Sequence, residues 1–140
     1  MRPMQTEAAA RVLADFEGRW DLQRQIDHTG GQTAQFTGQA VWTPDGHGMI
    51  YRETGQLEMT GGPVLQAERM YLWGADLDVC FEDGRFFHRV PAAGGTARHW
   101  CDPDSYIVQY DFTRWPAFST VWEVTGPRKA YRMVSQYSRR

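Results

Sequence analysis

The chain contains little cysteine and no long hydrophobic run. Only Cys80 and Cys101 occur among its 140 residues, too few for a disulfide framework, and each falls in an expected strand. No stretch approaches the roughly 20 apolar residues of a membrane-spanning helix. The first 16 residues lack the apolar core of a secretory signal. We therefore expect a cytoplasmic protein with reduced thiols and no membrane span, although the sequence leaves open whether the two cysteines pair.

The sequence also has no excess of positive or negative charge. The 15 lysines and arginines and the 17 acidic residues are interspersed, and the net charge is −2. No basic block could follow a phosphate backbone, which excludes nucleic acid as a partner. Leucine is rare for a helical protein. Six tryptophans, six tyrosines and seven phenylalanines give an aromatic content of 14%, a bias that favours sheets and cavity walls.

The length predicts a single domain over residues 1–140, long enough to bury a substantial core. A helix is expected at about residues 4–15, because Thr6 can cap it and the segment AAARVLA has strong helix propensity. The remaining chain, about residues 16–138, is expected to form a barrel.

From Phe16 onward the hydrophobic pattern has the period of two that a strand requires. On the first strand Trp20, Leu22 and Arg24 share one face, and similar alternation continues to Tyr137. Turn sequences such as HTGGQT, PDGHG and TGGP separate about ten such segments. Consecutive antiparallel strands favour an all-β, up-and-down barrel, because closure removes exposed edges. A half-open sheet wrapped around the helix is the alternative.

Several motifs resemble known barrels. Gly18 and Trp20, two apart at the start of the first strand, resemble the Gly-x-Trp signature of the calycin superfamily, which includes lipocalins and fatty-acid-binding proteins. DGRFFH, HWCDPDSY and GPRKAYRMVSQY together resemble an uncharacterised bacterial family of unknown function with a lipocalin-like barrel. This resemblance implies a calycin-like fold and no particular activity. We expect Trp20 to close the barrel bottom, stacked with Arg132 or Arg139.

A ten-stranded barrel leaves more interior volume than its side chains easily fill. Charged residues on inward faces must pair, reach water or meet a ligand, and Arg24 and Glu53 lie on such faces. Arg69, Arg85 and Arg89 pose the same question, since a one-residue slip in register turns a side chain outward. The candidates for ligand contact are the aromatic residues Trp42, Tyr51, Tyr110 and Trp122, and the orienting residues Arg24, Glu53, His88, His99 and Tyr106.

The two inward histidines fall on neighbouring expected strands. His88 is expected to share a face with Phe86, and His99 with Cys101. If these strands pair across the PAAGG turn, both imidazoles could face the same side. The spacing H-x-C-x-x-D-x-Y matches no standard zinc signature, and no metal ligand is assigned.

The favoured function is binding of a small, partly apolar, anionic ligand inside the barrel. An enzyme of the isomerase, cyclase or hydrolase type could use Glu53 with His88 or His99 in the same cavity. Haem binding through either histidine is a third possibility, because nitrobindin-like barrels have a similar outline and hold haem through a histidine. A protein-interaction module is a further one, and the chain is a possible homodimer. The sequence identifies no cofactor, and no standard catalytic motif is present.

Overall fold

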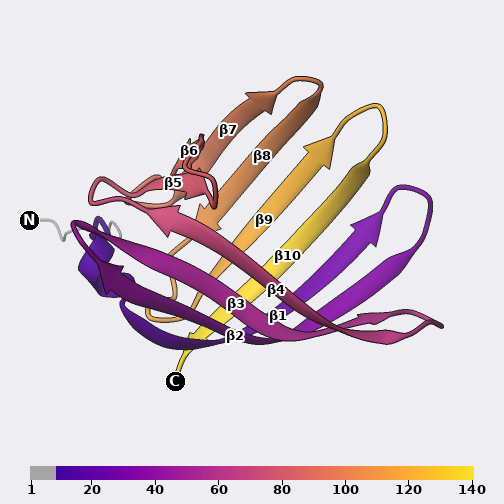
Figure 1. Cartoon of the computed structure of the whole chain (residues 1–140), viewed down its shortest axis with the longest axis horizontal. Helices are drawn as coiled ribbons and strands as arrows, with labels where there is room; N and C mark the ends of the chain where they lie inside the picture. Colours follow the sequence, from indigo (N-terminus) through magenta and orange to yellow (C-terminus); the bar gives the residue numbers. More distant parts are fainter. Residues whose placement is uncertain (1–8) are drawn as a thin grey trace, which may run out of the picture.

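The computed structural model describes residues 9–140, which form one sheet of ten antiparallel strands (Figure 1). The strands are β1 Gly18–His28, β2 Thr33–Asp45, β3 Gly48–Met59, β4 Val64–Trp73, β5 Asp78–Phe81, β6 Phe86–Arg89, β7 Gly95–Cys101, β8 Asp104–Asp111, β9 Phe118–Thr125 and β10 Ala130–Arg139.

The strand order is β6-β5-β4-β3-β2-β1-β10-β9-β8-β7. All neighbours are consecutive in the chain except β1 and β10, which bring the first and last strands together. The outermost strands, β6 and β7, contact each other without a hydrogen-bonded ladder. The sheet is therefore a nearly closed barrel, which confirms the all-β, ten-stranded fold expected from the alternating pattern.

The predicted helix over residues 4–15 is wrong for the residues that the structure describes, and residues 4–8 lie outside them. Residues 9–12 are not helical, and only Leu13–Phe16 form a 3-10 turn. Val12 is extended, with φ −122° and ψ 162°, and its N–H donates to the Asp15 carboxylate at 2.9 Å. Tertiary packing overrides the helix propensity of the alanines, because this turn is what carries Phe16 into the barrel.

Aromatic rings close one end of the barrel, which we call the closed end. Phe16 is fully buried, and five rings surround it with centroids 5.1–6.0 Å away: Trp42, Trp73, Phe112, Trp115 and Phe118. Beside them the Arg139 guanidinium lies 4.2 Å from the Trp20 ring centroid and donates to the carbonyls of Asp15 and Glu17. The predicted stack of Trp20 with Arg139 is confirmed, whereas Arg132 is exposed and pairs with Glu123.

Two facing glycines let β2 and β3 approach closely. Gly38 and Gly55 are register partners, and a Cβ on Gly38 would lie 2.1 Å from the Thr54 carbonyl oxygen. No side chain fits at that distance, so the bend of these strands requires glycine there.

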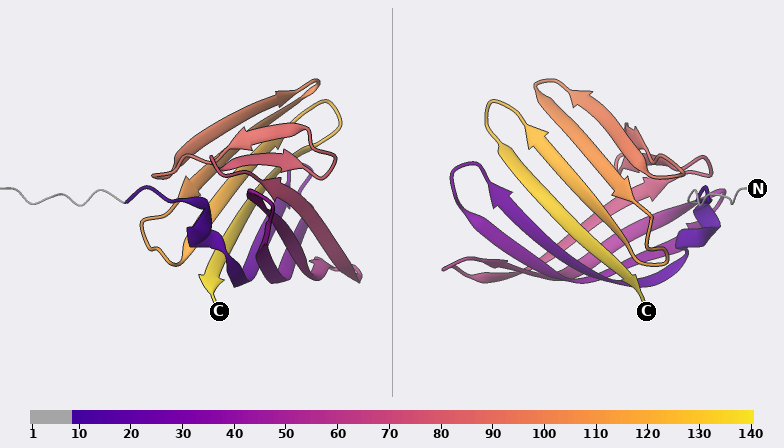
Figure 2. Two further views of the ribbon diagram at one scale, coloured as in Figure 1. Left: turned by 60° about the vertical axis from the view of Figure 1, so that its left-hand side comes forward. Right: turned by 180° about the vertical axis from the view of Figure 1, so that it is seen from behind.

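The opposite end, which we call the open end, is formed by the hairpins β1–β2, β3–β4, β7–β8 and β9–β10, which spread apart (Figure 2). The 3-10 turn lies at the other end of the strands. Strand β4 pairs with β3 along its whole length but with β5 only from Tyr71 to Trp73. The wall of the barrel is consequently incomplete beside the open end.

Candidate functional site

A buried ion pair crosses the middle of the barrel. Arg24 on β1 donates from both Nη atoms to Glu53 on β3, at 2.8 and 2.7 Å, and its Nε donates to the Ser135 hydroxyl at 2.7 Å. The Tyr51 hydroxyl donates to Glu53 Oε2 at 2.5 Å and lies 2.8 Å from the Tyr137 hydroxyl. Both carboxylate oxygens are thus occupied by partners from within the barrel.

This pairing determines the charge of Glu53. Burial by itself would raise the pKa of Glu53, but the hydrogen bonds and positive charge of Arg24 outweigh it and lower that pKa below its ordinary value. Burial also raises the pKa of Tyr51 well above 10, so the hydroxyl keeps its proton. Arg24 and Glu53 therefore form a hydrogen-bonded pair with no net charge.

Arg69 lies next to this pair toward the open end and has no such partner. It is the register partner of Glu53 on β4 and is half-buried, yet among the described residues no carboxylate lies within ion-pairing distance of it. Its side chain donates one long hydrogen bond, 3.4 Å to the Tyr71 hydroxyl, and lies 5.9 Å from the Trp122 ring centroid. Burial opposes its charge, but Tyr71 and Glu53 raise the pKa of Arg69, which stays cationic.

The enclosed space between the ion pair and the closed end is small. A cavity of about 30 Å³ is lined by residues from β1, β2, β3, β4, β5, β6, β8, β9 and β10. That volume suits about one water molecule. Within the described residues, the buried Trp42 Nε1 and His88 Nδ1 atoms have no hydrogen-bond partner, and both residues line this cavity. A single water is the occupant that such a volume and such polar groups accommodate.

His88 on β6 and His99 on β7 both make edge-on contacts with the Phe87 ring, with centroids 4.3 and 5.4 Å from it. His88 Nε2 lies 2.8 Å from the Tyr110 hydroxyl. Burial, with a smaller contribution from the charge of His99, lowers the pKa of His88 to about 4. The His88 imidazole is therefore neutral at pH 7.

The prediction that His88 shares a face with Phe86 is wrong. The register of β5 and β6 shifts between Val79 and Cys80, and this irregularity leaves Phe87 and His88 both buried while Phe86 is 54% exposed. The same region turns two suspected inward arginines to the surface. Arg85 pairs with Asp83, and Arg89 pairs with Asp78.

Seven of the nine candidate residues line the enclosed cavity: Arg24, Trp42, Tyr51, Glu53, His88, Tyr110 and Trp122. The other two, His99 and Tyr106, are half-buried nearer the open end, with ring centroids 6.1 Å apart. Lys129 donates to the Tyr106 hydroxyl at 3.0 Å and pairs with Asp104 at 3.3 Å. The alternating pattern marked Arg69 as inward, but nothing in the sequence showed that Glu53 would pair with Arg24 instead. Cys80 and Cys101 are free, half-buried thiols.

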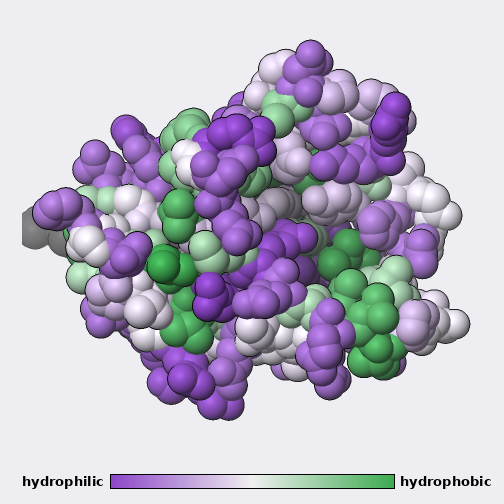
Figure 3. All heavy atoms as spheres, viewed as in Figure 1, coloured by the Kyte–Doolittle hydropathy of each residue, from purple (hydrophilic) through white to green (hydrophobic). Residues whose placement is uncertain are grey.

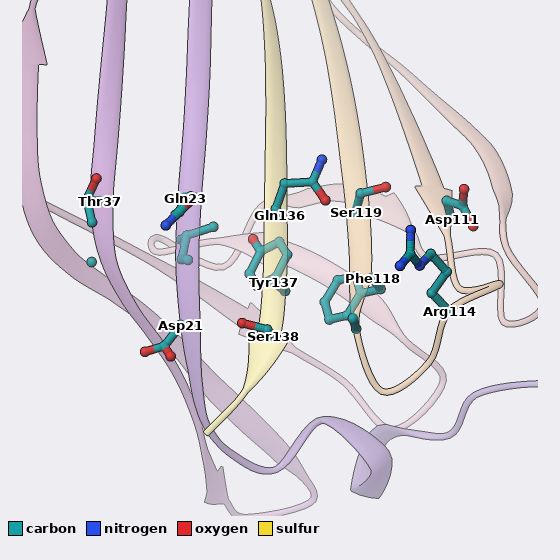
Figure 4. A pocket seen from close by; sticks show the side chains of 13 residues that line it. Asp21, Gln23, Thr37, Asp111, Arg114, Phe118, Ser119, Gln136, Tyr137 and Ser138 are labelled. Carbon is teal, nitrogen blue, oxygen red and sulfur yellow. The ribbon is translucent and has the colours of Figure 1, made fainter.

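A larger hollow of about 500 Å³ lies on the outer face of the barrel, across β1, β2, β9 and β10 (Figure 4). Gln23, Thr37, Gln136 and Ser119 form a cross-strand row of outward polar side chains there. All four are register neighbours on a solvated sheet face. The aromatic residues in its lining are Phe118 and Tyr137, and both side chains are buried in the interior of the barrel. Because the hollow has no exposed aromatic side chain in its lining, we do not place the functional site there.

Comparisons with known proteins place the chain in a family. Residues 16–139 match the family of unknown function DUF6314, to which the chain belongs. The solved structure of the S-type phycobiliprotein lyase CPES from Guillardia theta is similar in fold, with a TM-score of 0.62 and 8% identity over 91% of this chain and 90% of that one. A comparison with curated proteins finds no match. In the part of the chain that the structure describes, no helix is long and apolar enough to span a membrane.

Proposed function

We propose that this protein binds a small, partly apolar, anionic molecule at the open end of its barrel, beyond the Arg24–Glu53 pair. The observation that carries the proposal is Arg69, an inward, half-buried arginine without an acidic partner among the described residues. A half-buried cation without a counterion is costly, and a ligand carboxylate would supply that counterion.

The charges of the lining favour an anion. Arg24 and Glu53 neutralise each other, and His88 is uncharged because its pKa is lowered to about 4. Among these inward residues Arg69 is the cation without an ion-pair partner in the part of the chain that the structure describes. The planar guanidinium of arginine binds a carboxylate through two parallel, charge-assisted hydrogen bonds, which gives orientation as well as affinity.

The side chains around Arg69 favour a ligand with an apolar body. Tyr71, Trp122 and Leu57 are inward and only partly buried, although they pack against the core. Each would lose more apolar surface to water if a ligand covered it, at about 25 cal/mol per Å². The fold shared with a phycobiliprotein lyase is compatible with ligand binding but, at 8% identity, supports the fold alone.

The volume of the enclosed cavity supports a position for the ligand nearer the open end. Small-molecule pockets are usually about 300–1,000 Å³. The 30 Å³ cavity beneath the ion pair is far smaller, so the ligand is expected to lie among the open-end side chains instead of deep in the barrel. The same volume cannot accommodate a haem macrocycle beside His88, and we do not propose haem binding.

The same residues support an acid–base enzyme less well than they support ligand binding. Glu53 accepts hydrogen bonds on both oxygens and has a lowered pKa, which makes it a poor general base. His88 has a pKa of about 4, well below the near-neutral value that general catalysis favours. The geometry therefore supports binding over catalysis.

The proposal is tested by titrating the protein with dodecanoate and with dodecanol, which differ in the anionic head group alone. We expect dodecanoate to bind at least tenfold more tightly, by roughly the 1.5–3 kcal/mol of a charge-assisted hydrogen bond. The variant Arg69→Met should abolish that preference, and Arg69→Lys should retain part of it. Isothermal titration calorimetry measures both ligands.

Arg52→Met is the matched control. Arg52 lies on the adjacent strand β3 but points outward, where it pairs with Glu68. Its removal should leave the preference for dodecanoate unchanged. Equal affinities for the acid and the alcohol, or a preference that survives Arg69→Met, would contradict the proposed function.

A further inference from the structure

One strand of the barrel has a long edge that no other strand covers. Strand β4 begins at Val64, but β5 pairs with it only from Tyr71 onward. Within the described residues, the backbone of Val64–Met70 has β3 on one side and no strand on the other. Figure 1 shows β4 continuing past the end of β5 into the β3–β4 hairpin.

This edge lacks most of the usual protections against strand pairing. Proteins normally blunt an edge by keeping it short, by proline or lysine, or by a covering segment. Here the edge is seven residues long, and it contains no proline and no lysine. Val64 and Leu65 are large apolar residues that are 55% and 49% exposed. Figure 3 shows hydrophobic surface in the region of this hairpin.

The ends of the edge define one register for pairing with an identical strand. Pro63 precedes it and lacks the N–H that a ladder needs, and Tyr71 ends it by pairing with Phe81 of β5. An antiparallel pairing of two such edges that uses all seven residues must be centred on the midpoint between these limits. That midpoint is Ala67, a small residue.

We propose that a second copy of this chain pairs antiparallel with β4 about a two-fold axis at Ala67, which joins the two sheets. Val64 of one protomer then faces Met70 of its partner, Leu65 faces Arg69, and Gln66 faces Glu68. No like charges lie directly opposite each other, and each contact occurs twice by symmetry. Glu68 is also neutralised by Arg52 on β3, at 3.2 Å.

The occupant is a second copy because the edge is complementary to itself. The register that uses the whole edge covers the exposed Val64 with Met70 and places a neutral amide opposite the acidic Glu68. A one-residue shift of the axis to Glu68 would instead bring two carboxylates face to face. This inference depends on the backbone of β4 and not on ligand binding at Arg69.

Gln66 gives a test that is specific to this register, because it is exposed and faces the partner's Glu68. The change Gln66→Glu creates two repulsive pairs per dimer and should weaken dimerisation on the order of tenfold. The change Gln66→Lys creates two attractive pairs and should strengthen dimerisation severalfold. Sedimentation equilibrium over micromolar to submillimolar concentrations measures both dissociation constants.

Gln56→Glu is the control. Gln56 is the register partner of Gln66 on β3 and is likewise exposed, but it lies one strand inside the edge. It should have little effect. A wild-type protein that remains at the 16.1 kDa of one chain throughout would overturn the proposal. A dimer that is indifferent to the sign of charge at position 66 would overturn it equally, and in both cases the dodecanoate titration could still succeed.

Discussion

The two ends of the barrel differ in how far their apolar side chains are buried and their polar groups are paired. At the closed end, Phe16 is fully buried among five aromatic rings, and Arg139 donates to two carbonyls while it stacks on Trp20. At the open end, Arg69 lacks an acidic partner within the described residues, Leu65 is 49% exposed, and β4 has a free edge from Val64 to Met70.

This difference indicates a division of roles along the barrel axis. The closed end concentrates the apolar burial that stabilises the fold. The Arg24–Glu53 pair lies between the ends and removes charge from the interior. The open end keeps the groups that still have hydrogen bonds and apolar surface to offer, as expected where binding takes place.

The largest effect on stability is expected from Phe16→Ala. Removing a fully buried phenylalanine that contacts five rings should lower the free energy of unfolding by about 4 kcal/mol. Leu65→Ala at the open end is the comparison, and it should cost less than about 1 kcal/mol because half of that side chain is already exposed. Urea denaturation measures both. Similar losses at the two positions would break the contrast between the ends.

The next effect concerns the ion pair between the ends. Arg24→Leu leaves Glu53 buried without its counterion and should lower the free energy of unfolding by about 3 kcal/mol. The double variant Arg24→Leu with Glu53→Leu removes both charges and should recover most of that loss, because a buried pair contributes little relative to apolar residues. A double variant that remains as unstable as Arg24→Leu would show that the pair itself stabilises the fold.

An effect of similar size should appear as a pH dependence from His88. The folded pKa is about 4, against an ordinary value of 6.5, so below pH 6.5 the unfolded chain takes up a proton that the folded protein excludes. Stability should fall by about 3 kcal/mol as the pH is lowered from 6.5 through 4. The variant His88→Gln should lose less stability over this range. Parallel curves for the two proteins in urea denaturation would contradict the assignment.

Much of the fold could be predicted because its signals are local. Alternation placed Trp20, Leu22 and Arg24 on the inward face of β1, and the structure buries all three. Gly18 and Trp20 marked the start of that strand, and Arg139 is the one of the two proposed arginines that stacks on Trp20. These features depend on strand period and on turn residues, which a sequence displays directly.

The failures arose where distant contacts decide the local structure. The alanine-rich segment has the composition of a helix, but residues 9–12 are not helical and Leu13–Phe16 form a 3-10 turn that buries Phe16. The irregular register between β5 and β6 turned Phe86 outward while His88 stayed inward, because an extra residue in a strand changes which side chains share a face. Whether Glu53 would pair with Arg24 or with Arg69 depended on the side-chain geometry in three dimensions, which a strand pattern does not contain.

The position of β10 has a consequence for biosynthesis. This strand lies between β1 and β9, and its backbone hydrogen bonds join the six-stranded half of the sheet, β6 to β1, to the three-stranded half, β9 to β7. A ribosome must therefore release residues 130–139 before the two halves can unite. Until β10 emerges, the nascent protein presents two unfinished sheets, and chaperone demand should be greatest while β10 is still missing.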